Sequence, residues 1–236
     1  MKIALNRTLK SIWILCAATF VMLGNVAHAD HLSDANGLIT NLNISKKNVY
    51  GSNPSYIVWN GANSDAKTVC ATFVTLLLQH SYNWTNNTFQ TWMGSNSPSA
   101  ALYHDTILAQ NGFLKIAQVN QIHAGDVLAI KYFDNASTNT GHAMVAAGVP
   151  VARTATAPII PGTTQYELLV VDSSKSYHGT ADTRFISGIS GGIGRGTFRI
   201  YADANGSIAG YCWSNSSDST YYSPLVRDLV VGRIKF

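Results

Sequence analysis

The chain has 236 residues, only 12% of them charged, and its formal net charge at pH 7 is +4. Three of its 16 basic residues (Lys2, Arg7 and Lys10) and none of its 12 acidic residues lie in the first 29 positions, so the remainder carries 13 − 12 = +1. This near-neutral balance does not favour a nucleic-acid-binding protein, which needs many cations to neutralise phosphates, and we expect no nucleic-acid partner.

The first 29 residues have the layout of a secretory signal peptide. A basic leader is followed by an apolar run over residues 12–23 and by the small-residue sequence Ala-His-Ala at 27–29. The apolar run is shorter than the roughly 20 residues that a membrane span needs. We therefore expect cleavage between Ala29 and Asp30, no transmembrane anchor, and export to the periplasm or the extracellular space. Residues 30–236 are then long enough for a single domain with its own core.

In the first part of the exported chain we expect helices to alternate with irregular segments. Residues 30–66 are rich in turn signals and predict irregular structure. Apolar residues over 67–80 predict a buried helix. The polar and aromatic segment 81–97 predicts a loop. A second helix is expected over 97–111, with Ser97 as its N-cap.

The second part of the chain has the texture of β-strands. Short apolar runs bounded by turn residues lie at 125–133, 141–149, 166–174, 196–214 (a hairpin) and 228–236. Residues 174–195, rich in Gly and Ser, predict a long loop, and loops of that length in a compact domain are often functional. Helices followed by an antiparallel sheet predict an α+β domain, with N-terminal helices packed on the sheet.

Two cysteines remain after the leader, Cys70 and Cys212. In an oxidising compartment a single disulfide between them is one reading. A second reading makes Cys70 a small core residue. In the third, Cys70 is a nucleophile near a helix N-terminus, where free backbone N–H groups and the helix dipole favour the thiolate. The third reading depends on a helix that begins close to Thr68.

A cysteine nucleophile needs a base and a group that orients the base. His142 heads the apolar run 141–149, and Asp172 ends the mostly apolar stretch Glu-Leu-Leu-Val-Val-Asp at 167–172. If the two strands are antiparallel neighbours, the Asp172 carboxylate can fix the tautomer of His142. Taken singly, each reads more simply as a turn residue, but with Cys70 they form a candidate catalytic triad in the order Cys, His, Asp.

Several motifs resemble the NlpC-type branch of the papain-like cysteine peptidases, which is related to the CHAP amidases. Val-Cys-Ala-Thr-Phe-Val at 69–74 keeps the Cys, Phe and Val of the family's nucleophile motif, although Val69 replaces its acidic residue. Tyr-Ile-Val-Trp-Asn-Gly at 56–61 is similar to the family's upstream Tyr motif. The runs starting at 125 and 141 are similar to its Gly-Asp strand and its His strand. The resemblance covers about residues 54–175.

This resemblance implies a papain-like fold with a partly open barrel, and a peptidase or amidase of the bacterial cell wall that cuts peptidoglycan peptides. It makes Cys70 the nucleophile and His142 the base, with Asp172 as the orienting group. Tyr56 would hold the oxyanion or the substrate. The 174–195 loop is expected to rim the site, with His178, Arg184 and Arg195 as candidate substrate contacts.

The alternative function is a non-catalytic exported binding module on the same scaffold, with Cys70 and Cys212 joined. Counting free thiols separates the two hypotheses. The sequence carries no His-Glu-x-x-His, Cys-x-x-Cys or calcium-loop motif, so we expect neither a metal nor another cofactor. We also expect a monomer.

Overall fold

A computed structural model describes residues 30–134 and 139–235. The expected signal peptide, residues 1–29, lies outside these described residues. The helices are α1 (Asp30–Ser45), α2 (Cys70–Tyr82), α3 (Asn86–Met93), α4 (Ala100–Leu108) and α5 (Thr183–Ile186). Short 3-10 turns are present at Gly61–Asn63 and Val119–Gln121.

The strands form two sheets. The smaller sheet has the order β1-β3-β2 and contains β1 (Asn48–Tyr50), β2 (Tyr56–Val58) and β3 (Asp65–Thr68). The larger sheet contains β4 (Phe113–Ile116), β5 (Val127–Tyr132), β6 (Gly141–Ala146), β7 (Val151–Ala152), β8 (Thr164–Ser174), β9 (Gly192–Ala202), β10 (Ile208–Cys212), β11 (Tyr221–Tyr222) and β12 (Arg227–Ile234).

The large sheet is antiparallel throughout its described pairings and runs in the order β11-β10-β9-β8-β6-β5-β12-β4, with β7 added against β8. The protein is therefore an α+β domain with a large antiparallel sheet, as predicted. Within the described chain the end strands β11 and β4 do not pair, so the sheet is open and does not close into a barrel.

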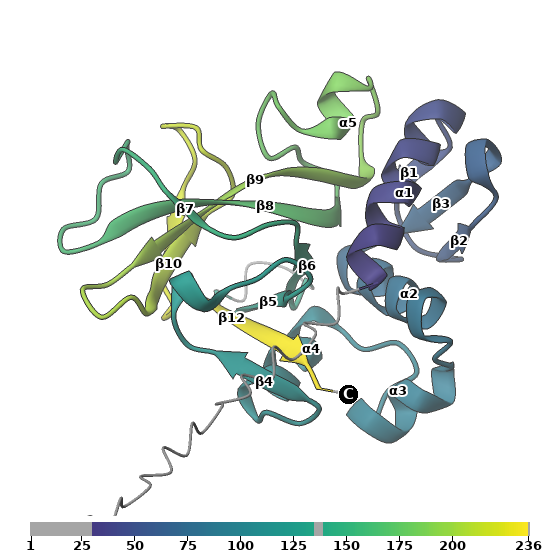
Figure 1. The fold of residues 1–236 in the computed structure, drawn as a ribbon, viewed down its shortest axis with the longest axis horizontal. Coiled ribbons are helices and arrows are strands. Elements are labelled where there is room, and N and C mark those ends of the chain that lie inside the picture. Colours follow the sequence, from purple (N-terminus) through teal and green to yellow (C-terminus); the bar gives the residue numbers. More distant parts are fainter. Residues whose placement is uncertain (1–29, 135–138, 236) are drawn as a thin grey trace, which may run out of the picture.

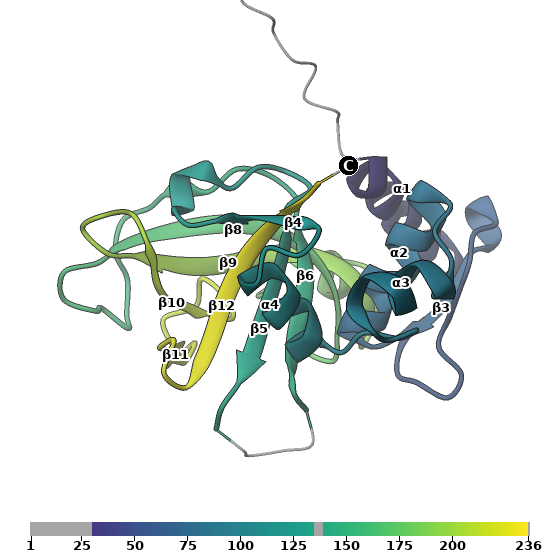
Figure 2. The same cartoon turned by 90° about the horizontal axis from the view of Figure 1, so that it is seen from below.

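The helices α1, α2 and α3 gather beside the small sheet at one end of the molecule, and the large sheet fills the other (Figure 1). Helix α4 packs on β5, β6 and β12, in the half of the large sheet that ends at β4 (Figure 2). Alternate strand residues, such as Val127 and Leu128 of β5, belong to two separate cores. One core is shared with the helices. The other lies on the opposite face of the large sheet and includes Ile116 of β4 and Tyr211 of β10.

Two helices lie where the sequence predicted irregular structure. Helix α1 occupies the start of the 30–66 segment, because Ala35, Leu38, Ile39 and Leu42 repeat at helical spacing and are buried. The turn signal that masked it, Gly37, sits on the solvent face with open space around it.

Helix α3 falls within the expected loop at 81–97. Thr85 and Thr88 form a reciprocal capping box at its start, and Phe89 and Met93 bury one face. The next helix is also displaced from its prediction, since Ser99 rather than Ser97 caps α4 by accepting a hydrogen bond from the Leu102 N–H.

Candidate functional site

Cys70 is the first residue of α2. The helix expected from residue 67 begins later, because residues 65–68 pair with both β1 and β2 as strand β3. Val69 is extended and serves as the N-cap, and it offers no side-chain cap to the first turn. The thiol therefore stands where backbone N–H groups are free of helical partners. This is the position that the thiolate hypothesis required, and the Cys70 residue is only 6% exposed.

His142 and Asp172 lie on neighbouring antiparallel strands, as predicted. Strand β6 pairs with β8 so that Met144 is opposite Asp172, which leaves His142 diagonally within reach of the carboxylate. The His142 Nε2 and Asp172 Oδ2 atoms are 2.7 Å apart, and both residues are buried. Gly141 permits this strand end, because a Cβ there would lie 1.9 Å from the Ile130 carbonyl oxygen.

Cys70 and His142 form a charge-coupled pair. Since Nε2 of His142 is bonded to Asp172, the other ring nitrogen, Nδ1, faces Cys70. Burial disfavours the thiolate, but the His142 charge and hydrogen bonds from His142, Ala143 and Ala71 outweigh burial and lower the pKa of Cys70. Burial also opposes charge on His142, yet Cys70 and Asp172 together raise the pKa of the imidazole to about 9. The lowered Cys70 pKa and the raised His142 pKa both favour a thiolate–imidazolium pair over the neutral thiol and imidazole.

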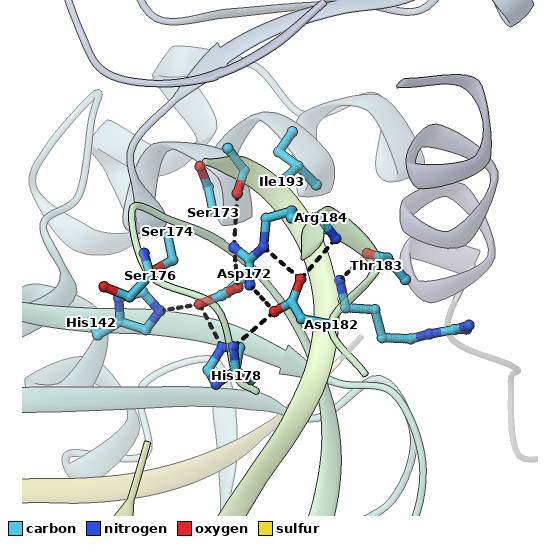
Figure 3. Close-up of polar contacts among 12 residues, drawn as sticks. His142, Asp172, Ser173, Ser174, Ser176, His178, Asp182, Thr183, Arg184 and Ile193 are labelled. Carbon is cyan, nitrogen blue, oxygen red and sulfur yellow. Dashed lines mark hydrogen bonds and ion pairs between the residues drawn. The ribbon is translucent and has the colours of Figure 1, made fainter. Parts of the chain in front are cut away.

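A second layer of buried charges holds Asp172 (Figure 3). His178 Nε2 lies 3.0 Å from Asp172 Oδ2, and Arg184 Nη1 lies 3.0 Å from Asp172 Oδ1. Arg184 also pairs with Asp182, whose Oδ2 accepts the backbone N–H of His178. Burial penalises the charge on Asp172, but Arg184, His178 and His142 hold the pKa of its carboxyl well below the usual range. These contacts therefore favour the anionic form of Asp172 and fix the orientation of its carboxylate.

A hydroxyl pair ties the nucleophile's segment to the strand that carries Asp172. Thr68 Oγ1 donates to Ser173 Oγ over 2.9 Å, and Ser173 Oγ donates to the Thr68 carbonyl oxygen over 2.8 Å. Thr68 is two residues before Cys70, and Ser173 follows Asp172 directly. The start of α2 and the end of β8 are thereby held together in the buried interior.

A cavity of about 430 Å³ lies beside His142. Its described lining comes from six strands, from the segment after β8, and from Asn139 before β6 and Trp213 after β10. The lining residues are Tyr50, Tyr132, Asn139, His142, Ser174, Lys175, Ser176, Trp213, Tyr222 and Arg227. Cys70 is outside this lining but next to it, since its sulfur lies 3.9 Å from the carbonyl oxygen of Gly141, the residue before His142. Trp213 forms part of the wall, with its ring edge-on to His142 at 4.6 Å between centroids.

Tyr50 was missed in the sequence and occupies the place expected of Tyr56. The Tyr56 hydroxyl donates to Asp65 Oδ1 at 3.1 Å, and Tyr56 is not part of the cavity lining. Tyr50 lines the cavity, and burial, followed by the charges of Cys70 and Asp172, raises its pKa to about 12. Its hydroxyl is thus protonated at neutral pH. The only sequence signal for Tyr50 is an aromatic residue at the end of a short apolar run.

The loop residues take roles other than the expected substrate contacts. His178 and Arg184 are buried and support Asp172, and residues 174–195 contain the short helix α5 and the start of β9. Asp182 completes this support and had no signal in the sequence. Arg195 is exposed, and its Nη1 donates to Asn36 Oδ1 at 3.2 Å.

Cys70 and Cys212 are both free and buried. Cys212 Sγ lies 3.3 Å from the Tyr201 hydroxyl and 3.5 Å from the Ser219 carbonyl oxygen, away from the partners of Cys70. The disulfide of the alternative hypothesis is not formed. In the described part of the chain no group of three or more His, Cys, Asp or Glu side chains is arranged to hold a metal ion. No helix within 30–134 or 139–235 is both long enough and apolar enough to cross a bilayer.

The comparisons with known proteins identify one relationship. No family model matches the chain, and no solved structure matches it. A protein of Acanthamoeba polyphaga mimivirus, Uncharacterized protein R653, is 33% identical to it over 191 residues, which cover 75% of this chain and 84% of the viral protein. The chain therefore belongs to the same protein family as this mimivirus protein.

Proposed function

We propose that the protein is an exported, papain-like cysteine hydrolase that cleaves amide bonds, with peptidoglycan peptides as its substrate. The observation that carries the proposal is the His142 imidazole, held between the Asp172 carboxylate at 2.7 Å and the Cys70 sulfur at the start of a helix. The resemblance of residues 54–175 to the NlpC-type peptidases supports the choice of a cell-wall peptide.

The chemistry begins from the thiolate–imidazolium pair. Cys70 Sγ adds to the amide carbonyl carbon and the carbonyl oxygen becomes an oxyanion, for which the free N–H groups of the first α2 turn are the nearest donors. Tyr50 is a second donor, because its high pKa keeps the hydroxyl protonated beside the thiolate. The resemblance gave this role to Tyr56, whose hydroxyl is bonded to Asp65.

His142 then manages the protons. The imidazolium gives its proton to the leaving amine nitrogen as the carbon–nitrogen bond breaks, which leaves a thioester on Cys70. Water attacks the thioester while the neutral imidazole accepts its proton, and the acid product departs from the regenerated pair. Asp172 keeps Nε2 of His142 protonated and Nδ1 facing the sulfur throughout.

The test compares the wild-type chain with Cys70→Ser and, as a matched control, Cys212→Ser. Release of new amino groups from purified peptidoglycan is followed at neutral pH with a reducing agent present. We expect Cys70→Ser to lose at least ~10³-fold in rate and Cys212→Ser to stay within a factor of two. Equal activity of the wild type and Cys70→Ser would contradict the proposal.

A further inference from the structure

The cavity beside His142 is positively charged. Its described lining contains two side chains of fixed charge, Lys175 and Arg227, and no Asp or Glu. Tyr50, Tyr132, Tyr222 and Trp213 supply most of the remaining wall. A site of this kind combines flat apolar surfaces with cations, so its electrostatics favour an anionic ligand group.

Lys175 provides the uncompensated charge. It follows β8 directly, its side chain is exposed, and its Nζ lies 5.7 Å from the centroid of the Tyr50 ring. No carboxylate of the described residues forms an ion pair with it. An ammonium placed over an aromatic face keeps its charge and remains available to a second, anionic partner.

Arg227 acts as a rigid wall rather than as a second free charge. Its guanidinium carbon lies 4.1 Å from the ring centroids of both Tyr132 and Tyr222. Its Nε and Nη2 bond Asp134 Oδ2 at 2.9 and 2.8 Å, and that ion pair offsets most of its charge. The stacked group is therefore held in place as part of the cavity wall.

The nearby buried carboxylate of Asp172 does not neutralise the positive charge of Lys175. Asp172 is fully buried, and its two oxygens are occupied by His142, His178 and Arg184. Its negative charge is neutralised within the protein interior, while Lys175 meets solvent. The thiolate of Cys70 is likewise paired with the imidazolium of His142.

We propose that the substrate is an acidic peptide, which presents a carboxylate to Lys175 next to the carbonyl that Cys70 attacks. This inference rests on the proposed function and names the substrate class of the same site. The tyrosine and tryptophan rings pack the apolar part of the peptide, and the ammonium selects the carboxylate against neutral analogues.

The experiment uses two electrophiles of nearly equal size, anionic iodoacetate and neutral iodoacetamide. Each forms a bond from Cys70 Sγ to its methylene carbon and releases iodide, so the chemistry is the same and only the carboxylate differs. Second-order rates at Cys70 are measured on the full chain at pH 7 and low salt, by peptide mass mapping. The ratio of the iodoacetate rate to the iodoacetamide rate reports the selectivity for a carboxylate.

We expect Lys175→Gln to lower this ratio by about 3- to 10-fold, the effect of removing one unit charge several ångströms away in a partly wet site. Lys175→Glu should lower it further, and the iodoacetamide rate should change less than about twofold. The matched control is Lys115→Gln, an exposed lysine of β4 beside a different cavity, which should leave the ratio unchanged. Salt at about 0.5 M should weaken the preference of the wild type, because screening shortens the reach of Lys175.

The outcomes separate this inference from the proposed function. If Cys70 reacts with both reagents and the ratio of the iodoacetate rate to the iodoacetamide rate is the same in the wild type and the Lys175 variants, the acidic-peptide proposal is overturned and the proposed function stands. If Cys70 reacts with neither reagent, both fail together. Two matched peptides then locate the carboxylate. One has a Glu side chain and an amidated C-terminus, and the other has a Gln side chain and a free C-terminus, so each offers a carboxylate at only one of the two positions. A Lys175-dependent change in KM for one of these peptides identifies which source binds.

Discussion

Arg184 is the central residue of the buried charge cluster, and its removal provides the sharpest test of how the site is supported. It is fully buried and bonds Asp182 through Nε at 2.9 Å and Nη2 at 2.6 Å. Its Nη1 lies 3.0 Å from Asp172 Oδ1 and donates to the Gly192 carbonyl oxygen at 2.9 Å. In Arg184→Met, two carboxylates and a carbonyl would lose their shared cation while remaining buried.

Removing one partner of a buried ion pair costs about 3–5 kcal/mol, because the other charge stays desolvated. We expect a loss of this size in the free energy of unfolding of Arg184→Met, measured by urea denaturation of the full chain at pH 7. The second variant, Arg184→Met with Asp182→Asn, should recover part of the loss, since it removes one of the two stranded charges. Asn also retains the capping of α5 by residue 182.

The matched control is Arg195→Met, an exposed arginine on strand β9 whose guanidinium donates to Asn36 Oδ1 at the surface. Its unfolding free energy should stay within about 0.5 kcal/mol of the wild type. A cost below about 1 kcal/mol for Arg184→Met would refute the reasoning, because it would mean that the two carboxylates do not depend on this cation.

The pH dependence provides a second readout of the same reasoning. Burial raises the pKa of Asp172, but Arg184 leads the charges that bring it well below its usual value. A carboxyl with a lowered folded pKa stabilises the protein above its unfolded pKa of about 3.9 and loses that contribution as the pH falls through the folded value. Without Arg184 the carboxyl binds a proton more readily, so the gap in stability between variant and wild type should narrow from pH 7 towards about pH 5.

Two further predictions concern the base and the strand behind the cluster. In the proposed mechanism His142 gives a proton to the leaving amine, and its pKa is about 9, so hydrolysis should fall above that pH. A pH profile of kcat that stays flat to about pH 11 would contradict this role. The same raised pKa stabilises the folded state below the pKa of about 6.5 that the imidazole has in the unfolded chain. Urea titrations should find that contribution lost as the pH rises through about 9. Gly194→Ala places a Cβ 2.5 Å from Arg184 Nε and should cost about 1–3 kcal/mol in urea. Gly148→Ala, which meets nothing within 4 Å, should be nearly neutral, and equal effects of the two substitutions would argue against a close-packed cluster.

Local patterns were enough to predict the α+β fold class and to select the members of the candidate triad. Apolar runs of two-residue period mark strands by themselves, and β5, β6, β8, β9, β10 and β12 all lie in or near predicted runs. His142 lies at the start of β6 and Asp172 lies near the end of β8, and antiparallel pairing of these neighbouring strands brings the two residues together. Their approach could therefore be predicted before any tertiary contact was known.

Helices were harder to predict where polar residues interrupt the pattern. The Asn36-Gly37 turn signal does not interrupt α1, because Gly37 faces water while the buried face of the helix continues through Leu38 and Leu42. In the 65–68 segment the opposite happened, since pairing with β1 and β2 overrode the helical spacing and delayed α2 until Cys70. That delay puts the thiol in the first turn of the helix.

The sequence by itself determined the α+β class, the antiparallel pairing of the central strands and the residues Cys70, His142 and Asp172, because each depends on short-range periodicity or on neighbouring strands. Only the tertiary structure decided that Tyr50 rather than Tyr56 lies in the cavity, and that His178 and Arg184 are buried supports of Asp172. These contacts join segments that are brought together only by the packing of the two cores. A charged loop residue that is buried in this way must pair with an opposite charge, so it supports the structure and does not contact substrate at the surface.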